Sequence, residues 1–97
     1  MAAFDLLGRR WTMRILWELG RGPCTFRELQ ARCDQVSPAI LNSRLKELRA
    51  GHIVTAEDKV GYRLTPLGEE LNASLNPLRR WAQRWAEQMG NEEAEGQ

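Results

Sequence analysis

Side chains with the chemistry to read nucleic-acid bases are concentrated in residues 37–51, SPAILNSRLKELRAG. An Asn can pair with adenine through two hydrogen bonds, a Lys can reach guanine, and an Ala can pack on a thymine methyl group. At about 100° per residue, Ala39, Ser43 and Lys46 fall on one side of a helix, with Asn42 on its flank. The segment therefore predicts a helix with a small, polar outer face that can approach another surface closely.

The two ends of this segment carry helix signals. Ser37 is a residue type that caps a helix N-terminus, and Pro38 loses no hydrogen bond at the first helical position. Gly51 is the residue type that most easily adopts the left-handed conformation that ends many helices. The opposite, apolar stripe consists of Leu41, Leu45 and Leu48. On its own, the segment fits the recognition helix of a winged helix-turn-helix and an ordinary surface helix equally well.

Two helices are predicted near the N-terminus. The first covers residues 2–7, AAFDLL, and Gly8 interrupts it. The second runs over residues 11–19 and ends in the Gly- and Pro-rich residues 20–23. The first helix is too short to bury its own apolar side chains, so we expect it to pack on the domain or on a second subunit.

A third predicted helix completes a helix-turn-helix. Thr25 and Glu28 form a capping box, which opens a helix of two turns over residues 25–33. Residues 34–36 then connect it to the segment 37–51. A short helix, a tight turn and a longer helix are the helix-turn-helix pattern, although many helical hairpins look like it.

A predicted hairpin follows directly and makes the pattern more specific. Residues 52–56 are rich in β-branched types, residues 57–59 break the run, and residues 60–65 alternate, with Val60, Tyr62 and Leu64 on one side. We interpret the hairpin as the wing of a winged helix-turn-helix, and we expect His52 to begin its first strand.

A long C-terminal helix is predicted from Thr65-Pro66 onward. Asn76-Pro77 predicts a kink, or two helices with Asn76 capping the second. Apolar residues at alternating steps of four and three form a heptad seam, namely Leu71, Leu75, Leu78, Ala82, Trp85 and Met89.

This seam and the first helix expose more apolar surface than a soluble monomer tolerates, so we predict a homodimer. Trp85 is expected near the centre of the interface, and Trp81 at its edge or in the domain core. The alternative is that the C-terminal helix folds back on its own domain. The candidate dimer residues are Phe4, Leu6, Leu7, Leu75, Leu78, Trp81, Ala82, Trp85 and Met89.

The totals indicate one domain, residues 1–89, followed by an acidic flexible tail over residues 90–97. The formal net charge is +1. Three of the 13 acidic residues lie in the tail, and without them 14 basic residues face ten acidic ones, a net charge of +4. This mildly basic domain permits DNA binding without requiring it.

Other functions find little support in the sequence. The N-terminus has no secretory signal pattern, so we expect a cytoplasmic protein. Cys24 and Cys33 lack the paired spacing of zinc ligands, so we expect no metal and no cofactor; Cys33 is predicted to be buried, and Cys24 to lie in an exposed turn. His52 has no evident nucleophile or carboxylate partner, so we do not expect an enzyme.

Four motifs, in this order and spacing, resemble the HxlR-type winged helix-turn-helix regulators and, more distantly, the MarR-type regulators. They are DLLGRRWTMRILWEL, CTFREL, VSPAILNSRLKEL and YRLTPLGEEL, and the match covers residues 4–81. The resemblance implies a mainly α-helical winged helix-turn-helix with a small β-hairpin. It also implies a bacterial or archaeal DNA-binding transcriptional regulator that dimerises through N- and C-terminal helices.

The chain departs from this family pattern in three places. It has no Cys-Pro pair ahead of the first helix, Ala39 stands where the family often has a basic residue, and the shorter wing offers only Lys59 and Arg63 as cations. The last two departures remove possible phosphate contacts and so bear on DNA affinity. They also keep open an alternative function, a winged-helix protein-interaction module with weak or no DNA binding.

The predicted partners are double-stranded DNA and a second copy of the chain, with a small-molecule or redox effector as a further possibility. Ala39, Asn42, Ser43 and Lys46 are the candidate base readers, while Arg44 could equally form a bridge within the fold. The full set of candidate DNA-binding residues is Thr25, Ser37, Ala39, Asn42, Ser43, Arg44, Lys46, Arg49, Lys59 and Arg63.

Overall fold

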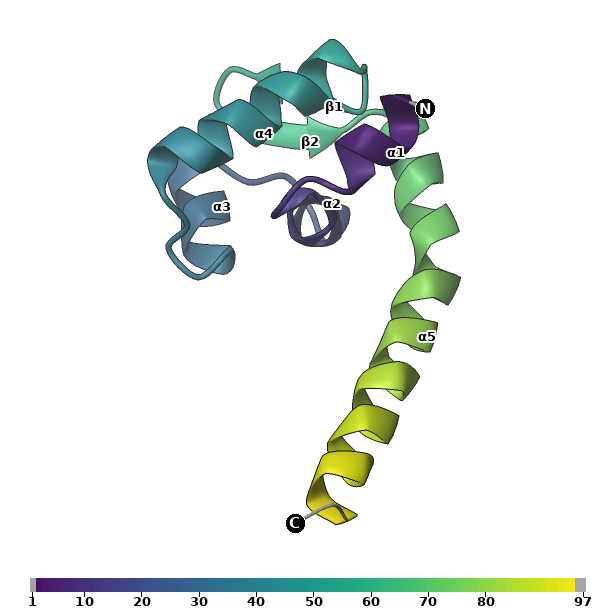
Figure 1. Ribbon diagram of the computed structural model, residues 1–97. Helices are drawn as coiled ribbons and strands as arrows, with labels where there is room; N and C mark the ends of the chain where they lie inside the picture. The colour runs from purple at the N-terminus through teal and green to yellow at the C-terminus, as the bar shows by residue number, and fades with distance from the viewer. Residues whose placement is uncertain (1, 96–97) are drawn as a thin grey trace.

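The computed structural model describes the backbone of residues 2–95 and the side chains of residues 3–90. Five helices and one antiparallel hairpin follow one another along the chain (Figure 1). Their bounds are α1 Ala2–Leu7, α2 Thr12–Gly20, α3 Phe26–Arg32, α4 Pro38–Ala50, β1 Val54–Glu57, β2 Gly61–Leu64 and α5 Pro66–Glu95. This order confirms the predicted mainly α-helical winged helix-turn-helix.

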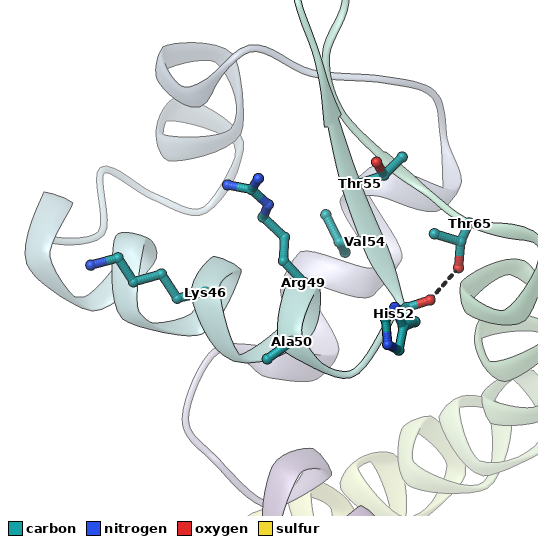
Figure 2. Close-up of a pocket in the computed structure, with 7 residues that line it drawn as sticks. All are labelled: Lys46, Arg49, Ala50, His52, Val54, Thr55 and Thr65. Carbon is teal, nitrogen blue, oxygen red and sulfur yellow. Dashed lines mark hydrogen bonds between the residues drawn. The ribbon is translucent and has the colours of Figure 1, made fainter.

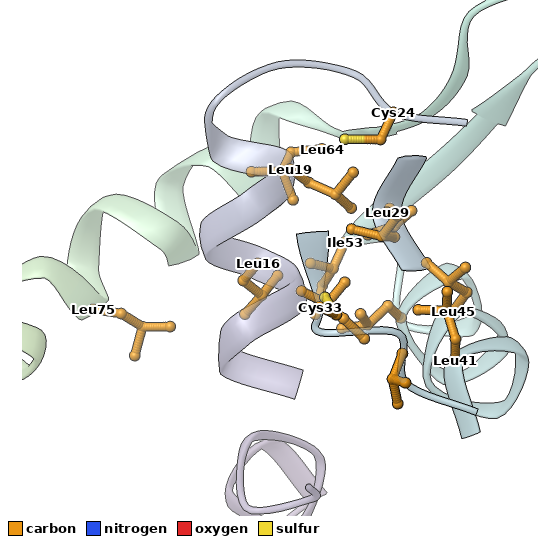
Figure 3. Close-up of a cluster of buried hydrophobic side chains, with 14 residues drawn as sticks. Leu16, Leu19, Cys24, Leu29, Cys33, Leu41, Leu45, Ile53, Leu64 and Leu75 are labelled. Carbon is orange, nitrogen blue, oxygen red and sulfur yellow. The ribbon is translucent and has the colours of Figure 1, made fainter. Parts of the chain in front are cut away.

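One hydrophobic core joins α2, α3, α4 and the hairpin (Figure 3). The predicted apolar stripe of α4 is inside it, since Leu41, Leu45 and Leu48 are each at most 1% exposed. Helix α2 contributes Ile15, Leu16 and Leu19. The other core residues are Cys24, Leu29, Cys33, Val36, Ile53, Val54, Leu64 and Leu75.

The predicted caps of the helix-turn-helix are confirmed. The Thr25 hydroxyl accepts a hydrogen bond from the Glu28 amide at 3.2 Å, and the Glu28 carboxylate accepts one from the Thr25 amide at 3.0 Å. The Ser37 hydroxyl accepts a hydrogen bond from the Ile40 amide at 3.2 Å. These side chains satisfy backbone donors that a helix start leaves free, so the bounds of α3 and α4 follow from local sequence.

The end of α4 differs from the prediction. Gly51 has a φ of −84°, and His52 is the residue in the left-handed region, at 61°. The Ile53 amide donates to the Leu48 carbonyl and the His52 amide to the Arg49 carbonyl, which together form a Schellman ending. His52 therefore belongs to the turn that ends α4, and the prediction that it begins a strand is wrong.

The hairpin pairs Val54 with Leu64 and Glu57 with Gly61. Val60 was predicted in the second strand but lies in the turn and is exposed. Gly61 has a φ of 99°, and a side chain there would collide with the Cys24 carbonyl. The second strand therefore begins one residue later than predicted, at a position that only glycine fits.

Cys24 is fully buried, so its predicted place in an exposed turn is wrong. It forms a β-bridge with Tyr62: its amide donates to the Tyr62 carbonyl at 3.0 Å and its carbonyl accepts from the Tyr62 amide at 2.7 Å. The segment ahead of α3 therefore acts as a third, one-residue strand of the small sheet, which carries its thiol into the core.

Helix α5 continues without a break through Pro77, so the predicted division into two helices is wrong. Its predicted start is confirmed, because the Thr65 hydroxyl accepts a hydrogen bond from the Gly68 amide at 3.0 Å. A side chain at Gly68 would collide with the Ile53 carbonyl oxygen, so the first turn of α5 lies directly on the chain that leaves α4. The helix backbone extends to Glu95; residues 96–97 of the predicted tail lie outside the described residues, and its flexibility stays a prediction.

The first half of α5 packs on α2, and its second half extends away from the rest of the molecule (Figure 1). Arg79 joins the two helices. Its guanidinium donates to the Asn72 carbonyl and the Asn76 side chain, lies 3.4 Å from the Met13 carbonyl, and stacks 5.4 Å over the Trp17 ring. Burial lowers the pKa of Arg79. None of the helices in the described part of the chain is long and apolar enough to cross a membrane.

Candidate nucleic-acid interface

The outer face of α4 is the centre of the candidate interface. Ala39, Ser43 and Lys46 are exposed on the side of the helix opposite the buried leucines, and Asn42 is exposed on the flank of that side. None of these four side chains has a hydrogen bond or ion pair to the described side chains of residues 3–90. The structure therefore brings the four candidate base readers together on one accessible helix face.

A hollow of about 450 Å³ lies between the last turns of α4 and strand β1. Figure 2 shows Arg49 extending from α4 along the side that faces β1, and Lys46 further toward the start of the helix. Seven residues line the hollow, namely Lys46, Arg49, Ala50, His52, Val54, Thr55 and Thr65. Three of them carry basic groups and none is a carboxylate, so the hollow has the polarity of an anion site.

His52 and Thr55 were not among the candidate contacts predicted from the sequence. His52 was taken for the first residue of a strand, whereas the Schellman turn places it at the mouth of this hollow. The turn is further held by the Thr65 hydroxyl, which donates to the His52 carbonyl at 2.6 Å (Figure 2). The position of His52 depends on which residue ends α4 in the left-handed conformation, and the sequence alone does not determine that residue.

Arg44 takes part in an ion pair within the fold. Its side chain is only 17% exposed, and its guanidinium lies 3.2 Å from the Glu47 carboxylate. The same carboxylate lies 3.4 Å from Arg9, in the loop between α1 and α2. Of the two roles predicted for Arg44, the structure favours the internal bridge, which links the N-terminal loop to α4.

The wing presents one cation free of ion pairs and one paired cation. Lys59 is exposed in the turn of the hairpin, at a φ of 74°. Arg63 pairs with Glu57 on the neighbouring strand, and this pair would have to open, or share the guanidinium, for Arg63 to contact a phosphate. Thr25 and Ser37 are exposed, with their hydroxyls already accepting the capping hydrogen bonds.

A second surface of possible function lies on α5. Leu67, Leu71, Ser74, Leu78, Trp81 and Trp85 follow at steps of four and three, and the exposed fractions of Leu78, Trp81 and Trp85 are 47%, 52% and 54%. The Trp81 and Trp85 rings stack with centroids 6.2 Å apart. Trp81 is therefore outside the domain core. Leu67 also belongs to this stripe, although it was not among the predicted seam residues.

Other predicted dimer residues divide between this surface and the core. Leu75 is 8% exposed and packs in the core of its own chain, so it does not belong to the exposed stripe. Leu6 and Leu7 are half-buried against the core, while Phe4 is 69% exposed. Ala82 is exposed beside the stripe, and Met89 extends the stripe by one more step of four.

The described side chains include no candidate metal site, and both cysteines are buried. No group of three or more His, Cys, Asp or Glu residues lies close enough together to hold an ion within the described part of the chain. Burial raises the pKa of the Cys24 thiol, against the opposing effect of Arg32, whose Nη1 lies 2.9 Å from its Sγ. Burial likewise raises the pKa of Cys33 to about 11. Both thiols therefore stay protonated at neutral pH.

Comparison with known proteins places this interface in a family. A family model described as HxlR-like helix-turn-helix matches residues 6–90. The chain is 36% identical over 92 residues to the HTH-type transcriptional regulator YodB of Bacillus subtilis, covering 89% of this chain and 82% of YodB. It is also 32% identical over 89 residues to the regulator YvaP of the same organism, covering 86% and 82%.

Solved structures agree with the sequence relatives. A possible HxlR family transcriptional factor from Thermoplasma volcanium superposes with a TM-score of 0.80 at 28% identity, covering 87% of this chain and 81% of that one. Quinone-bound YodB from B. subtilis superposes with a TM-score of 0.77 at 37% identity, covering 86% and 92%. The chain therefore belongs to the HxlR-like helix-turn-helix family, and it is a DNA-binding transcriptional regulator.

Proposed function

We propose that this regulator binds a palindromic site on duplex DNA as a homodimer, with α4 in the major groove and the hairpin on the sugar-phosphate backbone. The observation that carries the proposal is the contrast between the two faces of α4. One face is buried by leucines, and the other leaves four small or polar side chains exposed, with no hydrogen bond or ion pair to the described side chains of residues 3–90. A winged helix-turn-helix places such a face against base edges.

The division of labour among the contacts follows from their chemistry. Asn42 and Lys46 are proposed to read bases through hydrogen bonds, while Ala39 and Ser43 allow the helix to approach closely. Arg49, Lys59 and Arg63 are proposed to contact phosphates, which position the protein without specifying sequence. Arg44 keeps its internal bridge to Glu47 in this proposal.

The dimer is proposed to form through α1 and the exposed stripe of α5. Phe4, Leu78, Trp81 and Trp85 together expose a large apolar surface, which a soluble protein normally covers. A two-fold axis through α5 would let each copy cover the stripe of the other. It would also present two α4 helices to successive major grooves, about 34 Å apart.

A footprint on the DNA upstream of the protein's own gene, at two salt concentrations, tests the proposal. We expect protection of two half-sites about one helical turn apart, with affinity falling steeply as salt rises because phosphate binding releases counterions. Sedimentation at micromolar concentration supplies the assembly state. No protection of any duplex at low salt would favour a winged-helix protein-interaction module instead.

We further propose that an effector controls binding and that the regulator acts in the cytoplasm. Support for an effector comes from YodB, for which quinone-bound and diamide-treated structures exist. Cys24 and Cys33 are not proposed as its redox sensors, because both are fully buried. DNA affinity measured with and without a quinone would test this proposal, and equal affinities would remove quinones from it.

A further inference from the structure

The hollow between α4 and β1 contains two side chains that the proposed contacts above do not use. His52 is exposed, while its backbone is held in the left-handed region by the Schellman turn and by the Thr65 hydroxyl. Thr55 is half-buried on β1, opposite Arg63 in the hairpin register. Both lie beside Arg49, which reaches into the hollow from α4 (Figure 2).

The charges around the hollow are all basic. Lys46 and Arg49 come from α4, His52 from the turn, and β1 and Thr65 contribute hydroxyl groups. The carboxylates on neighbouring elements do not line it within the described part of the chain. Glu47 on α4 is paired with Arg9 and Arg44, Glu57 on β1 is paired with Arg63, and Glu69 and Glu70 of α5 line other surfaces. An anion of the size of a phosphate would meet two or three donors and no repelling group.

DNA offers such an anion at this position. When a recognition helix occupies the major groove and the wing lies on the backbone, the strand between the two grooves passes between helix and wing. We infer that this hollow holds one phosphodiester of that strand, with Arg49, His52 and Thr55 donating hydrogen bonds to its oxygens. The inference rests on the proposed function and assigns His52 and Thr55 a role in it.

The three donors suit a phosphodiester in different ways. The Arg49 guanidinium supplies a permanent positive charge and several N–H donors, while the His52 imidazole and the Thr55 hydroxyl can each donate one hydrogen bond to a phosphate oxygen. Such contacts position the protein on the backbone without reading its sequence.

Titration of duplex DNA into the full chain at several salt concentrations tests this. His52→Asn keeps a residue type that tolerates the left-handed region and replaces the imidazole with a shorter side chain. It should weaken binding about threefold on specific and random duplexes alike, because it removes a contact to the backbone and not to a base.

Two further variants complete the test. Thr55→Val, which suits a strand and lacks the hydroxyl, should weaken binding about threefold. Arg80→Ala removes one exposed cation of α5 far from the hollow and should change neither affinity nor its salt dependence. If the parent binds DNA and both His52→Asn and Thr55→Val bind it equally well, the inference is overturned. If the parent binds no duplex at all, the proposed function fails instead.

Discussion

Helices α4 and α5 both bury one face and expose the other, but their exposed faces differ in kind. That of α4 carries Ala39, Asn42, Ser43 and Lys46, which are small or polar. That of α5 carries Leu78, Trp81 and Trp85, which are large and apolar. The small, polar face of α4 is stable in water and can replace its hydrogen bonds to water with hydrogen bonds to base edges. A surface of the second kind gains free energy when another apolar surface covers it.

The difference fits the two partners proposed above, duplex DNA at α4 and a second copy of the chain at α5. Along α4, some residues face the core and their neighbours face the solvent, so stability and base contact depend on different side chains. Variants of single residues can therefore test the core, the dimer and the base contacts one at a time.

The largest expected effect is on folding. Leu41→Ala removes a fully buried side chain from the inner face of α4 and should lower the free energy of unfolding by about 2–5 kcal/mol. Thermal and urea denaturation would measure it. Asn42→Ala, one residue along but exposed, is the matched control and should change stability by less than about 0.5 kcal/mol. Similar losses for both variants would contradict the two-faced description of α4.

The next largest effect is on assembly. Trp85→Ala removes a stacked aromatic ring from the exposed stripe of α5 and should weaken the proposed dimer by about 2–4 kcal/mol, as large central aromatic residues do in protein interfaces. Sedimentation over a concentration series would measure it. Val60→Ala is the control, since Val60 is a 43% exposed apolar side chain in the turn of the hairpin, away from the stripe. Equal dimerisation of parent and Trp85→Ala would remove this interface.

A smaller effect is expected on base recognition. Asn42→Ala should cost about 1–3 kcal/mol on the specific site and leave affinity for random duplex nearly unchanged, because it removes a base contact only. Competition binding with specific and random duplexes would measure the ratio.

The control for base recognition is Lys59→Ala in the wing. It should weaken specific and random duplexes alike and lower the salt slope by about one, because it removes a phosphate contact. If Asn42→Ala weakened both duplexes equally, Asn42 would be a positioning contact instead.

The smallest expected effect is that of oxidants on the cysteines. Cys24 and Cys33 lie on neither exposed face, and burial raises the pKa of both thiols. A thiol reagent should therefore label neither in the folded protein and both after denaturation. Mild oxidation should leave DNA affinity unchanged in the parent and in Cys24→Ser. Rapid labelling of the folded parent, lost in Cys24→Ser, would show that Cys24 becomes accessible.

Local interactions made much of this fold predictable from the sequence. The caps at Thr25, Ser37 and Thr65 each satisfy a backbone donor within three residues, so the starts of α3, α4 and α5 follow from short motifs. The buried stripe of α4 follows likewise from helical spacing. The candidate base readers were predictable for the same reason, since they are simply the opposite face.

Positions decided by tertiary packing were not predictable in this way. Gly51 has the intrinsic preference for a left-handed ending, yet His52 adopts it, because Ile53 must reach both the Leu48 carbonyl and the core. Leu75 fits a heptad seam as well as Leu67 does, and only the docking of α5 on α2 decides which is buried. The hollow beside α4 depends on both, so its lining could not be predicted from spacing.

The close packing of Gly68 on the Ile53 carbonyl bears on which operators the proposed dimer can accept. Because the first turn of α5 packs on the backbone that leaves α4, the proposed recognition helix and the proposed dimer helix are joined by a direct contact. The distance between the two α4 helices of the proposed dimer is then set by rigid protein geometry. Moving one half-site by a single base pair shifts it by about 3.4 Å and also turns it around the duplex axis. Spacer length would therefore discriminate among genomic sites independently of the bases that are read.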